Sequence, residues 1–118
     1  MDAWGTQVLV QTDTGVFKVI DADDIYWMEA EGEETRIRLK GSKSLWDRRR
    51  LGNLEAFYQE LGFLRIHRNH MVNLRRIREI RRRKGGRGWE VKLEPPVNRV
   101  LPVSAGEADR LFQAFGHV

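Results

Sequence analysis

Cysteine is absent from this chain of 118 residues. Its absence excludes disulfide bonds and thiolate metal sites, and it is compatible with a reducing compartment. Long apolar runs are also missing, since none approaches the roughly 20 residues that a membrane-spanning helix requires. Residues 1–5 lack the basic and then apolar pattern of a signal peptide. We therefore expect a cytoplasmic protein that does not enter a membrane.

The sequence also lacks the motifs of the common enzyme classes. It has no phosphate-binding loop, no nucleophile elbow and no evident pair of catalytic carboxylates. His67 and His70 have a spacing that zinc sites use, but in a strand two residues three apart point to opposite faces. The sequence therefore predicts a non-enzymatic protein without a metal site or a cofactor.

Positive charge, in contrast, is concentrated in one segment. Residues 65–87 carry ten lysines and arginines against one acid, although the whole chain has a net charge of only +4. Residues 1–64 carry eight basic residues against twelve acidic ones. Such a cluster is typical of a protein that binds a polyanion, and the pI of about 9.8 favours nucleic acid.

Apolar alternation and turn residues predict one mostly β domain over residues 1–118, with roughly eight short strands and two helices. The expected strands include residues 6–12, 16–20, 25–30, 35–39, 42–45, 89–93 and 97–103, and another begins at residue 63. Residues 25–30 are apolar almost throughout, as expected of a strand buried on both faces. One helix is expected from about residue 48 or 53 to 61. A second follows Ser104, which forms a capping box with Glu107.

Residues 70–84 allow two interpretations. Met71, Leu74, Ile77 and Ile80 recur every three residues, a spacing that fits an amphipathic basic helix about as well as it fits strands. A helix here would make residues 70–88 an arginine-rich element for binding RNA. Periodicity alone does not decide between the two.

The order of the elements and several motifs resemble the LytTR family of bacterial DNA-binding domains. The matching motifs are Ile-Tyr-Trp-Met-Glu-Ala at residues 25–30, Phe-Leu-Arg-Ile-His-Arg at 63–68, Val-Asn-Leu at 72–74 and Leu-Pro-Val-Ser at 101–104. The resemblance covers roughly residues 6–115. It implies an elongated sandwich of short strands in small stacked sheets, with residues 77–83 as a strand, and it implies that loops enter the DNA grooves.

The resemblance also implies which residues contact DNA. Base contacts are expected at Thr35, Arg36, Arg68 and Asn69, and a possible third base site at Ala105, with Asn98 or Arg99 as substitutes. Arginine can donate two parallel hydrogen bonds to guanine, which suits position 68. Phosphate contacts are expected at Lys40, Lys43, Arg75, Arg76 and Arg87. The glutamates at 31, 33 and 34 would repel phosphate, so we expect them to face away from DNA.

These observations predict a sequence-specific transcriptional regulator that binds double-stranded DNA. By the family habit, two copies would bind a direct repeat, and a receiver or other regulatory domain could lie outside this chain. One alternative is an RNA-binding module that uses residues 70–88. Another is a protein-interaction module whose basic face docks an acidic partner.

Overall fold

The computed structural model describes residues 6–116 as short strands with two α-helices and three 3₁₀ turns. The strands are β1 (Gln7–Asp13), β2 (Val16–Asp21), β3 (Ile25–Glu31), β4 (Glu34–Leu39), β5 (Ser44–Asp47), β6 (Phe63–His67), β7 (His70–Asn73), β8 (Ile77–Arg82), β9 (Trp89–Leu93) and β10 (Val100–Val103). The helices are α1 (Leu51–Glu60) and α2 (Ala108–Ala114), and the 3₁₀ turns are η1 (Ala22–Asp24), η2 (Leu74–Arg76) and η3 (Ala105–Glu107). The predicted fold class, mostly β with two helices, is confirmed.

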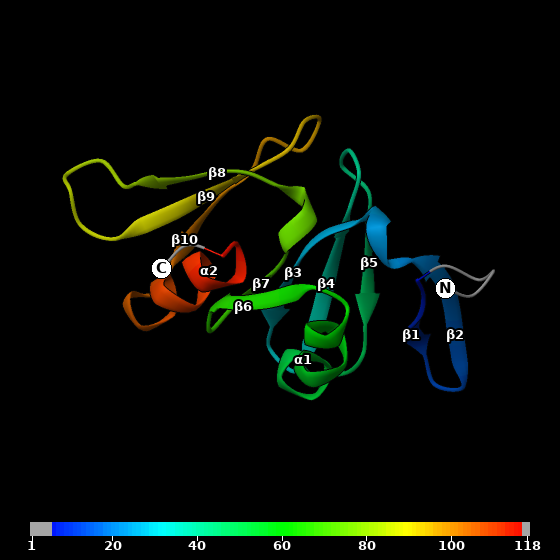
Figure 1. Ribbon diagram of the computed structural model, residues 1–118. Coiled ribbons are helices and arrows are strands. Elements are labelled where there is room, and N and C mark those ends of the chain that lie inside the picture. The colour runs from blue at the N-terminus through cyan, green and yellow to red at the C-terminus, as the bar shows by residue number, and fades with distance from the viewer. Residues whose placement is uncertain (1–5, 117–118) are drawn as a thin grey trace.

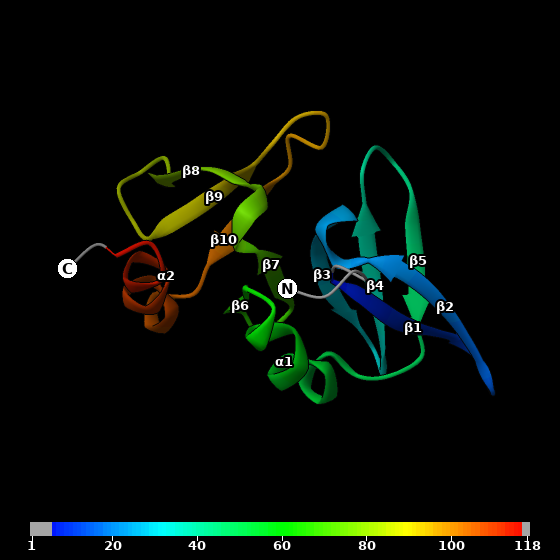
Figure 2. The same cartoon turned by 45° about the vertical axis from the view of Figure 1, so that its right-hand side comes forward.

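The strands form three small antiparallel sheets. β1 and β2 make the first sheet, the central sheet has the order β5-β4-β3-β7-β6, and the third has the order β10-β9-β8. Figure 1 shows the central sheet between the β1–β2 hairpin and the third sheet, and Figure 2 shows the hairpin crossing in front of β4 and β5. The molecule measures 46 × 35 × 27 Å, in keeping with the predicted elongated sandwich.

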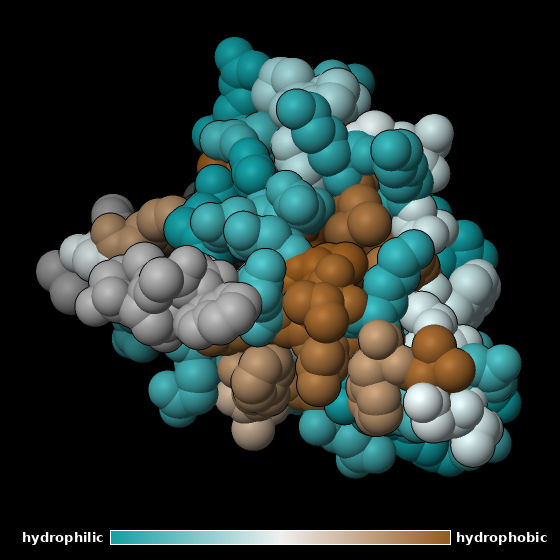
Figure 3. All heavy atoms as spheres, turned by 90° about the vertical axis from the view of Figure 1, so that its right-hand side faces the viewer, coloured by the Kyte–Doolittle hydropathy of each residue, from teal (hydrophilic) through white to brown (hydrophobic). Residues whose placement is uncertain are grey.

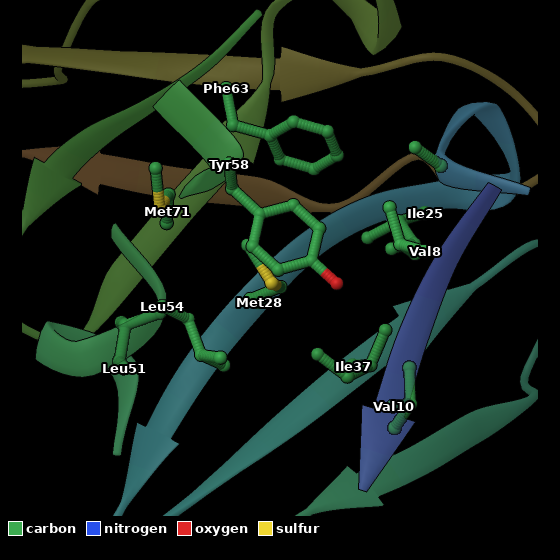
Figure 4. Close-up of a cluster of buried hydrophobic side chains, with 11 residues drawn as sticks. Val8, Val10, Ile25, Met28, Ile37, Leu51, Leu54, Tyr58, Phe63 and Met71 are labelled. Carbon is green, nitrogen blue, oxygen red and sulfur yellow. The ribbon is translucent and has the colours of Figure 1, made fainter. Parts of the chain in front are cut away.

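Both faces of the central sheet are buried, each in its own core. Met28 of β3 and Ile37 of β4 belong to the first core, where Val8 and Val10 of β1 meet side chains of α1 (Figure 4). Trp27, beside Met28, belongs to the second core, which the third sheet and α2 cover. Successive side chains of a strand point to opposite faces, so a strand shared by two cores must be apolar throughout. The run of apolar residues at 25–30 is therefore explained by the burial of both faces of β3.

The segment that allowed two interpretations folds as β7, η2 and β8 rather than as a long helix. Met71 packs in the first core, whereas Leu74, Ile77 and Ile80 pack against the second. Ile77 and Ile80 share a face despite their odd spacing because the register with β9 shifts between Ile77 and Glu79. Such a bulge inserts one residue into a strand and reverses the alternation after it.

Four local predictions differ from the structure. The strand expected at residues 97–103 is confined to Val100–Val103. The strand expected at residues 42–45 lies at Ser44–Asp47, because the turn at Gly41 (φ 76°) extends further than expected. The first helix begins at Leu51. The capping box is wrong, since the Ser104 side chain makes no capping hydrogen bond and Glu107 pairs with Arg110 at 2.9 Å. Within residues 6–116, no helix is long and apolar enough to cross a membrane.

The outer side of the β1–β2 hairpin carries exposed apolar side chains. Val16, Phe17 and Val19 of β2 are about half exposed, as are Leu9 of β1 and Phe57 of α1. Figure 3 shows the apolar side chains gathered on this face, which lies at the right of Figure 1. The hairpin thus contributes only one of its faces to the first core.

The buried carboxylate of Asp47 joins the first two sheets, and its removal should destabilise the fold. Asp47 is fully buried, and its oxygens accept hydrogen bonds from the Arg49 guanidinium at 2.8 and 2.9 Å and from the Gln11 N–H at 3.3 Å. Breaking a buried ion pair leaves donors unsatisfied, so Asp47→Ala should lower the free energy of unfolding by about 3 kcal/mol. Urea denaturation measures this change. The matched control is Glu33→Ala, which removes an exposed ion pair to Arg50 and should change stability by less than about 0.5 kcal/mol; equal losses would contradict the role given to Asp47.

Candidate nucleic-acid interface

A row of charged and polar side chains crosses four strands of the central sheet. Arg36 of β4 lies opposite Glu29 of β3, Glu29 lies opposite His70 of β7, and His70 lies opposite His67 of β6. Residues directly opposite each other in antiparallel strands share a face, so these four side chains project from one face of the sheet. It is the face of Trp27, two residues before Glu29. All four side chains are partly buried.

The turn that follows His67 carries the predicted base contacts Arg68 and Asn69, and both are exposed. Arg65 holds this turn: its guanidinium donates to the backbone carbonyls of His67, at 3.2 Å, and of Arg68, and it pairs with Glu55 of α1 at 2.7 Å. The Nδ1 atom of His67 accepts a hydrogen bond from the Asn69 N–H at 3.1 Å. The turn backbone is thus fixed, whereas the Arg68 side chain forms no ion pair with any residue in the described range 6–116.

Two other loops lie beside this turn. The Ala30 N–H, near the end of β3, donates to the Asn69 carbonyl at 2.9 Å, which places the β3–β4 turn next to it. The Ser104 N–H donates to the Ile66 carbonyl at 2.8 Å, which places the start of η3 on its other side. We call this part of the molecule the β6–β7 end. It contains the β3–β4 turn, the β6–β7 turn and residues 104–107.

The β6–β7 end brings together four of the predicted base-contact residues. They are Arg36, Arg68, Asn69 and Ala105. Three inter-strand spacings, roughly 14 Å, separate β4 from β6. This is comparable with the width of a DNA major groove, about 12 Å.

Thr35 does not belong to this surface. Its side chain is fully buried, and its hydroxyl donates a hydrogen bond to the Arg49 carbonyl at 2.8 Å. Alternation along β4 turns Thr35 toward the first core and Arg36 toward the opposite face. The predicted base contact at Thr35 is therefore wrong, because the side chain would have to leave the core to touch a base.

The acidic β3–β4 turn also lies at the β6–β7 end, whereas we expected its glutamates to face elsewhere. Glu31 pairs with Arg36 at 3.4 Å, and the Arg36 guanidinium lies 3.9 Å from the ring centre of Trp46. Glu33 pairs with Arg50. Arg36 is thus held in place and partly neutralised, which leaves Arg68 as the exposed cation at the centre of this end.

Four of the five predicted phosphate contacts lie at the opposite end of the central sheet, which we call the β4–β5 end. Lys40 and Lys43 lie in the β4–β5 turn. Arg75 pairs with Asp23 of η1 at 2.8 Å, and Arg76 donates to the Asp23 carbonyl. A strand as long as β3 places the two ends roughly 20 Å apart.

The fifth predicted phosphate contact, Arg87, lies in the connection between β8 and β9. In the register of the third sheet, Arg82 at the end of β8 lies opposite Trp89 of β9. Trp89 in turn lies opposite Val103 of β10, just before residues 104–107. The β8–β9 connection therefore leaves the third sheet on the side of the β6–β7 end, as the left part of Figure 1 shows.

The three candidates for a third base site do not lie together. Ala105 begins η3 at the β6–β7 end. Asn98 and Arg99 lie in the β9–β10 turn, which is at the β4–β5 end because the Glu94 N–H donates to the Arg76 carbonyl at 2.9 Å. The backbone of Asn98 and Arg99 thus lies at the other end of the sheet from Arg68, although the Arg99 guanidinium reaches back over the Trp27 ring at 5.8 Å and contributes to lowering the pKa of His70.

The two histidines lie closer together than the sequence indicated. We expected His67 and His70 to point to opposite faces of one strand, but a turn separates them and the two side chains face each other across β6 and β7. Their ring centres are 5.2 Å apart. Within residues 6–116, no group of three or more His, Asp or Glu side chains is arranged to hold a metal ion.

Sequence reasoning missed the positioning role of Arg65. Its acidic partner, Glu55, lies ten residues away on a helix. No spacing rule connects a strand residue to that position, so the sequence shows Arg65 only as one more member of a basic segment. It also missed that the guanidinium groups of Arg38 and Arg99 both lie near the Trp27 ring, at 5.5 and 5.8 Å from its centre.

Comparisons with known proteins agree with this architecture. A family model described as the LytTr DNA-binding domain matches residues 15–116. Among solved structures, a LytTr DNA-binding domain from Bacillus cereus is similar, with a TM-score of 0.73 over 94% of this chain and 97% of that chain. The two sequences are 18% identical, so this likeness shows the fold alone. No curated protein matches the chain.

The position of His70 predicts a pH-dependent stability. Burial lowers the pKa of His70 from 6.5, and the neighbouring His67 adds to this effect, while Glu29 opposes it. The unfolded chain then binds a proton more readily than the folded one, so the free energy of unfolding should fall as the pH drops below about 6.5. Urea denaturation between pH 8 and pH 5 measures the fall, and His70→Gln should reduce it. Parallel pH curves for the two chains would contradict the assignment to His70.

Proposed function

Because the chain belongs to the LytTR family of DNA-binding domains, we propose that it is a sequence-specific transcriptional regulator that reads duplex DNA with the turns at its β6–β7 end. The observation that carries this proposal is the exposed Arg68–Asn69 pair at the tip of a turn whose backbone is fixed by Arg65 and His67. A reader on a fixed turn loses little conformational freedom when it enters a groove.

The chemistry of Arg68 and Asn69 suits major-groove readout. A guanidinium can donate two parallel hydrogen bonds to O6 and N7 of guanine, and an asparagine amide can bond N6 and N7 of adenine. Arg36 is a second reader, because its pair with Glu31 is long, at 3.4 Å, and partly exposed, and it is easily exchanged for a contact to DNA. Ala105 offers only a methyl group, which suits contact with a thymine methyl.

The third sheet supplies charge for the DNA backbone. Arg82 and Arg83 lie at and beyond the end of β8, and Arg87 lies in the same connection, on the side of the β6–β7 end. We propose that these arginines contact phosphates that flank the bases read by Arg68. A straight duplex across this end does not reach Lys40, Lys43, Arg75 and Arg76, which lie roughly 20 Å away.

The RNA-binding alternative loses its main support. It required residues 70–88 to form an arginine-rich helix, but this segment folds as two strands, a 3₁₀ turn and a connection. Proteins that bind single strands stack bases on exposed aromatic rings. Trp89, next to the basic segment, is covered by the Arg82 guanidinium at 4.5 Å and by Phe112.

By the habit of the family, we propose that two copies of the chain bind a direct repeat and that neither acts as an enzyme. The chain then acts as one DNA-binding domain, alone or joined to a receiver domain. A module that docks an acidic protein is the remaining alternative. A gel shift against a library of duplexes separates the two, since a protein-docking module would show no preference for any duplex sequence.

Arg68→Ala tests the reader role directly. A bidentate contact to guanine discriminates against other bases by about 1–3 kcal/mol, so the variant should lose roughly ten-fold or more in affinity for the selected duplex and should tolerate a changed base at one position. The matched control is Arg82→Ala, which removes one arginine outside the reading turn. It should weaken all duplexes about equally and reduce the slope of log K against log salt by about 1.

Fluorescence anisotropy with the selected duplex and with single-base variants provides both measurements. If the two variants behaved alike toward every duplex, Arg68 would have no reader role. If neither variant changed binding to any duplex, the β6–β7 end would not be the DNA-binding surface.

A further inference from the structure

We propose that the pocket between the β4–β5 turn and the β9–β10 turn binds a phosphate group. The pocket has a volume of about 220 Å³ and lies at the β4–β5 end, remote from the turns assigned to base reading. Its lining includes Trp27, Arg38, Ser42, Lys43, Val97 and Arg99. Figures 1 and 2 both show the two turns side by side, at the top of each view.

Three cations line this pocket, and few acids oppose them. Lys43 and Arg99 are exposed, and neither forms an ion pair with any residue of the described range. Arg38 donates from Nε and Nη2 to the Glu29 carboxylate, which leaves its Nη1 atom without a partner among residues 6–116. Glu29 offsets one of the three positive charges. A net positive field therefore remains within a small concave volume, where it attracts an anion.

The donors suit a phosphate group in both geometry and charge. A guanidinium presents a planar fork of N–H donors that matches two oxygens of a phosphate, and a lysine ammonium adds a point charge. The Ser42 hydroxyl is a further donor on the rim. A phosphomonoester carries close to two negative charges at neutral pH, which balances the positive charge left by the three cations and Glu29.

The burial of Trp27 and the two arginines over its ring favour binding of an anion rather than of a nucleobase or an apolar ligand. Its side chain is 95% buried (relative exposure 5%), and the guanidinium groups of Arg38 and Arg99 lie over its ring at 5.5 and 5.8 Å. A nucleobase therefore has no open aromatic face to stack on. The indole N–H is buried without a hydrogen-bond partner among the described residues, so no protein acceptor masks the effect of a nearby anion on its NMR signal.

The test is an NMR titration of the full chain, labelled with ¹⁵N, with inorganic phosphate. The chain has four tryptophans, and among those in the described residues only Trp27 lines the pocket, so its indole N–H signal reports on it. We expect a saturable shift of this signal, with a dissociation constant on the order of 1 mM because exposed ion pairs are individually weak. Sodium chloride at the same ionic strength should not produce it. A shift shared by all the indole signals, or one that chloride reproduces, would overturn the proposal.

Two variants and a matched control locate the binding to this pocket. Lys43→Ala and Arg99→Ala should each weaken phosphate binding about five-fold, because each removes one exposed cation from the lining. Both side chains are exposed, but Arg99 also lies over the ring of the core residue Trp27 at 5.8 Å, so the Arg99 variant is checked by urea denaturation and Lys43→Ala is the variant that leaves the core untouched. Lys40→Ala removes the same charge from the same turn but outside the pocket lining, and it should leave binding nearly unchanged. An equal effect of Lys40→Ala would show a general charge effect and overturn the site.

The same variants distinguish the two sources of a phosphate group. If the pocket takes a free phosphate or a phosphomonoester, Lys43→Ala should bind the selected duplex as well as the parent chain does. If the pocket takes a phosphodiester of DNA, the duplex itself should shift the Trp27 signal, and Lys43→Ala should weaken duplex binding together with phosphate binding. The result does not depend on the reading turns, because Arg68→Ala should leave the phosphate titration unchanged.

Discussion

β3 packs against a different core on each of its faces, and this double burial determines what its neighbours present to solvent. With Met28 in one core and Trp27 in the other, a shift of one residue in the register would exchange the two faces and bury charge. The register is therefore strongly specified. It places Glu29 opposite both Arg36 and His70, so the charged row at the β6–β7 end is a consequence of how the apolar part of β3 is packed.

Local charge in the sequence overstates the charge that is free to bind DNA. The basic segment holds ten lysines and arginines, but Arg65, Arg75, Arg76 and Arg81 already pair with carboxylates in the folded chain. Exposed pairs of this kind contribute only about 0.2–1 kcal/mol each, so a phosphate can replace a carboxylate at small cost. The Arg65 pair differs, because Arg65 also holds the β6–β7 turn through two backbone carbonyls, and losing it would release the turn.

The sequence predicted those features that depend on one strand and its own alternation. It predicted the strand buried on both faces at residues 25–30, the mostly β fold and the two helices. It did not predict the bulge after Ile77, because the position of a bulge is fixed by the partner strand. The bulge gives this strand apolar residues at every third position, a spacing that is also typical of a helix. Other features depend on how distant segments pair. These features are the burial of Thr35, the contact between His67 and His70, and the separation of Lys40 from Arg68. A family resemblance names positions near a site, but the direction of each side chain follows from the register of the sheet.

Arg38 connects the two ends of the central sheet through a single contact. Its guanidinium lies over Trp27 at the pocket between the β4–β5 and β9–β10 turns, and the same group donates to Glu29, which lies between Arg36 and His70 in the charged row. Glu29 favours protonation of His70, so the charge of the row depends on whether Arg38 stays paired with Glu29. In the proposed pocket an anion takes the Nη1 atom of Arg38, which has no partner among residues 6–116, while Nε and Nη2 stay with Glu29. An anion at this position therefore leaves the pair between Arg38 and Glu29 intact, and with it the charge of the row.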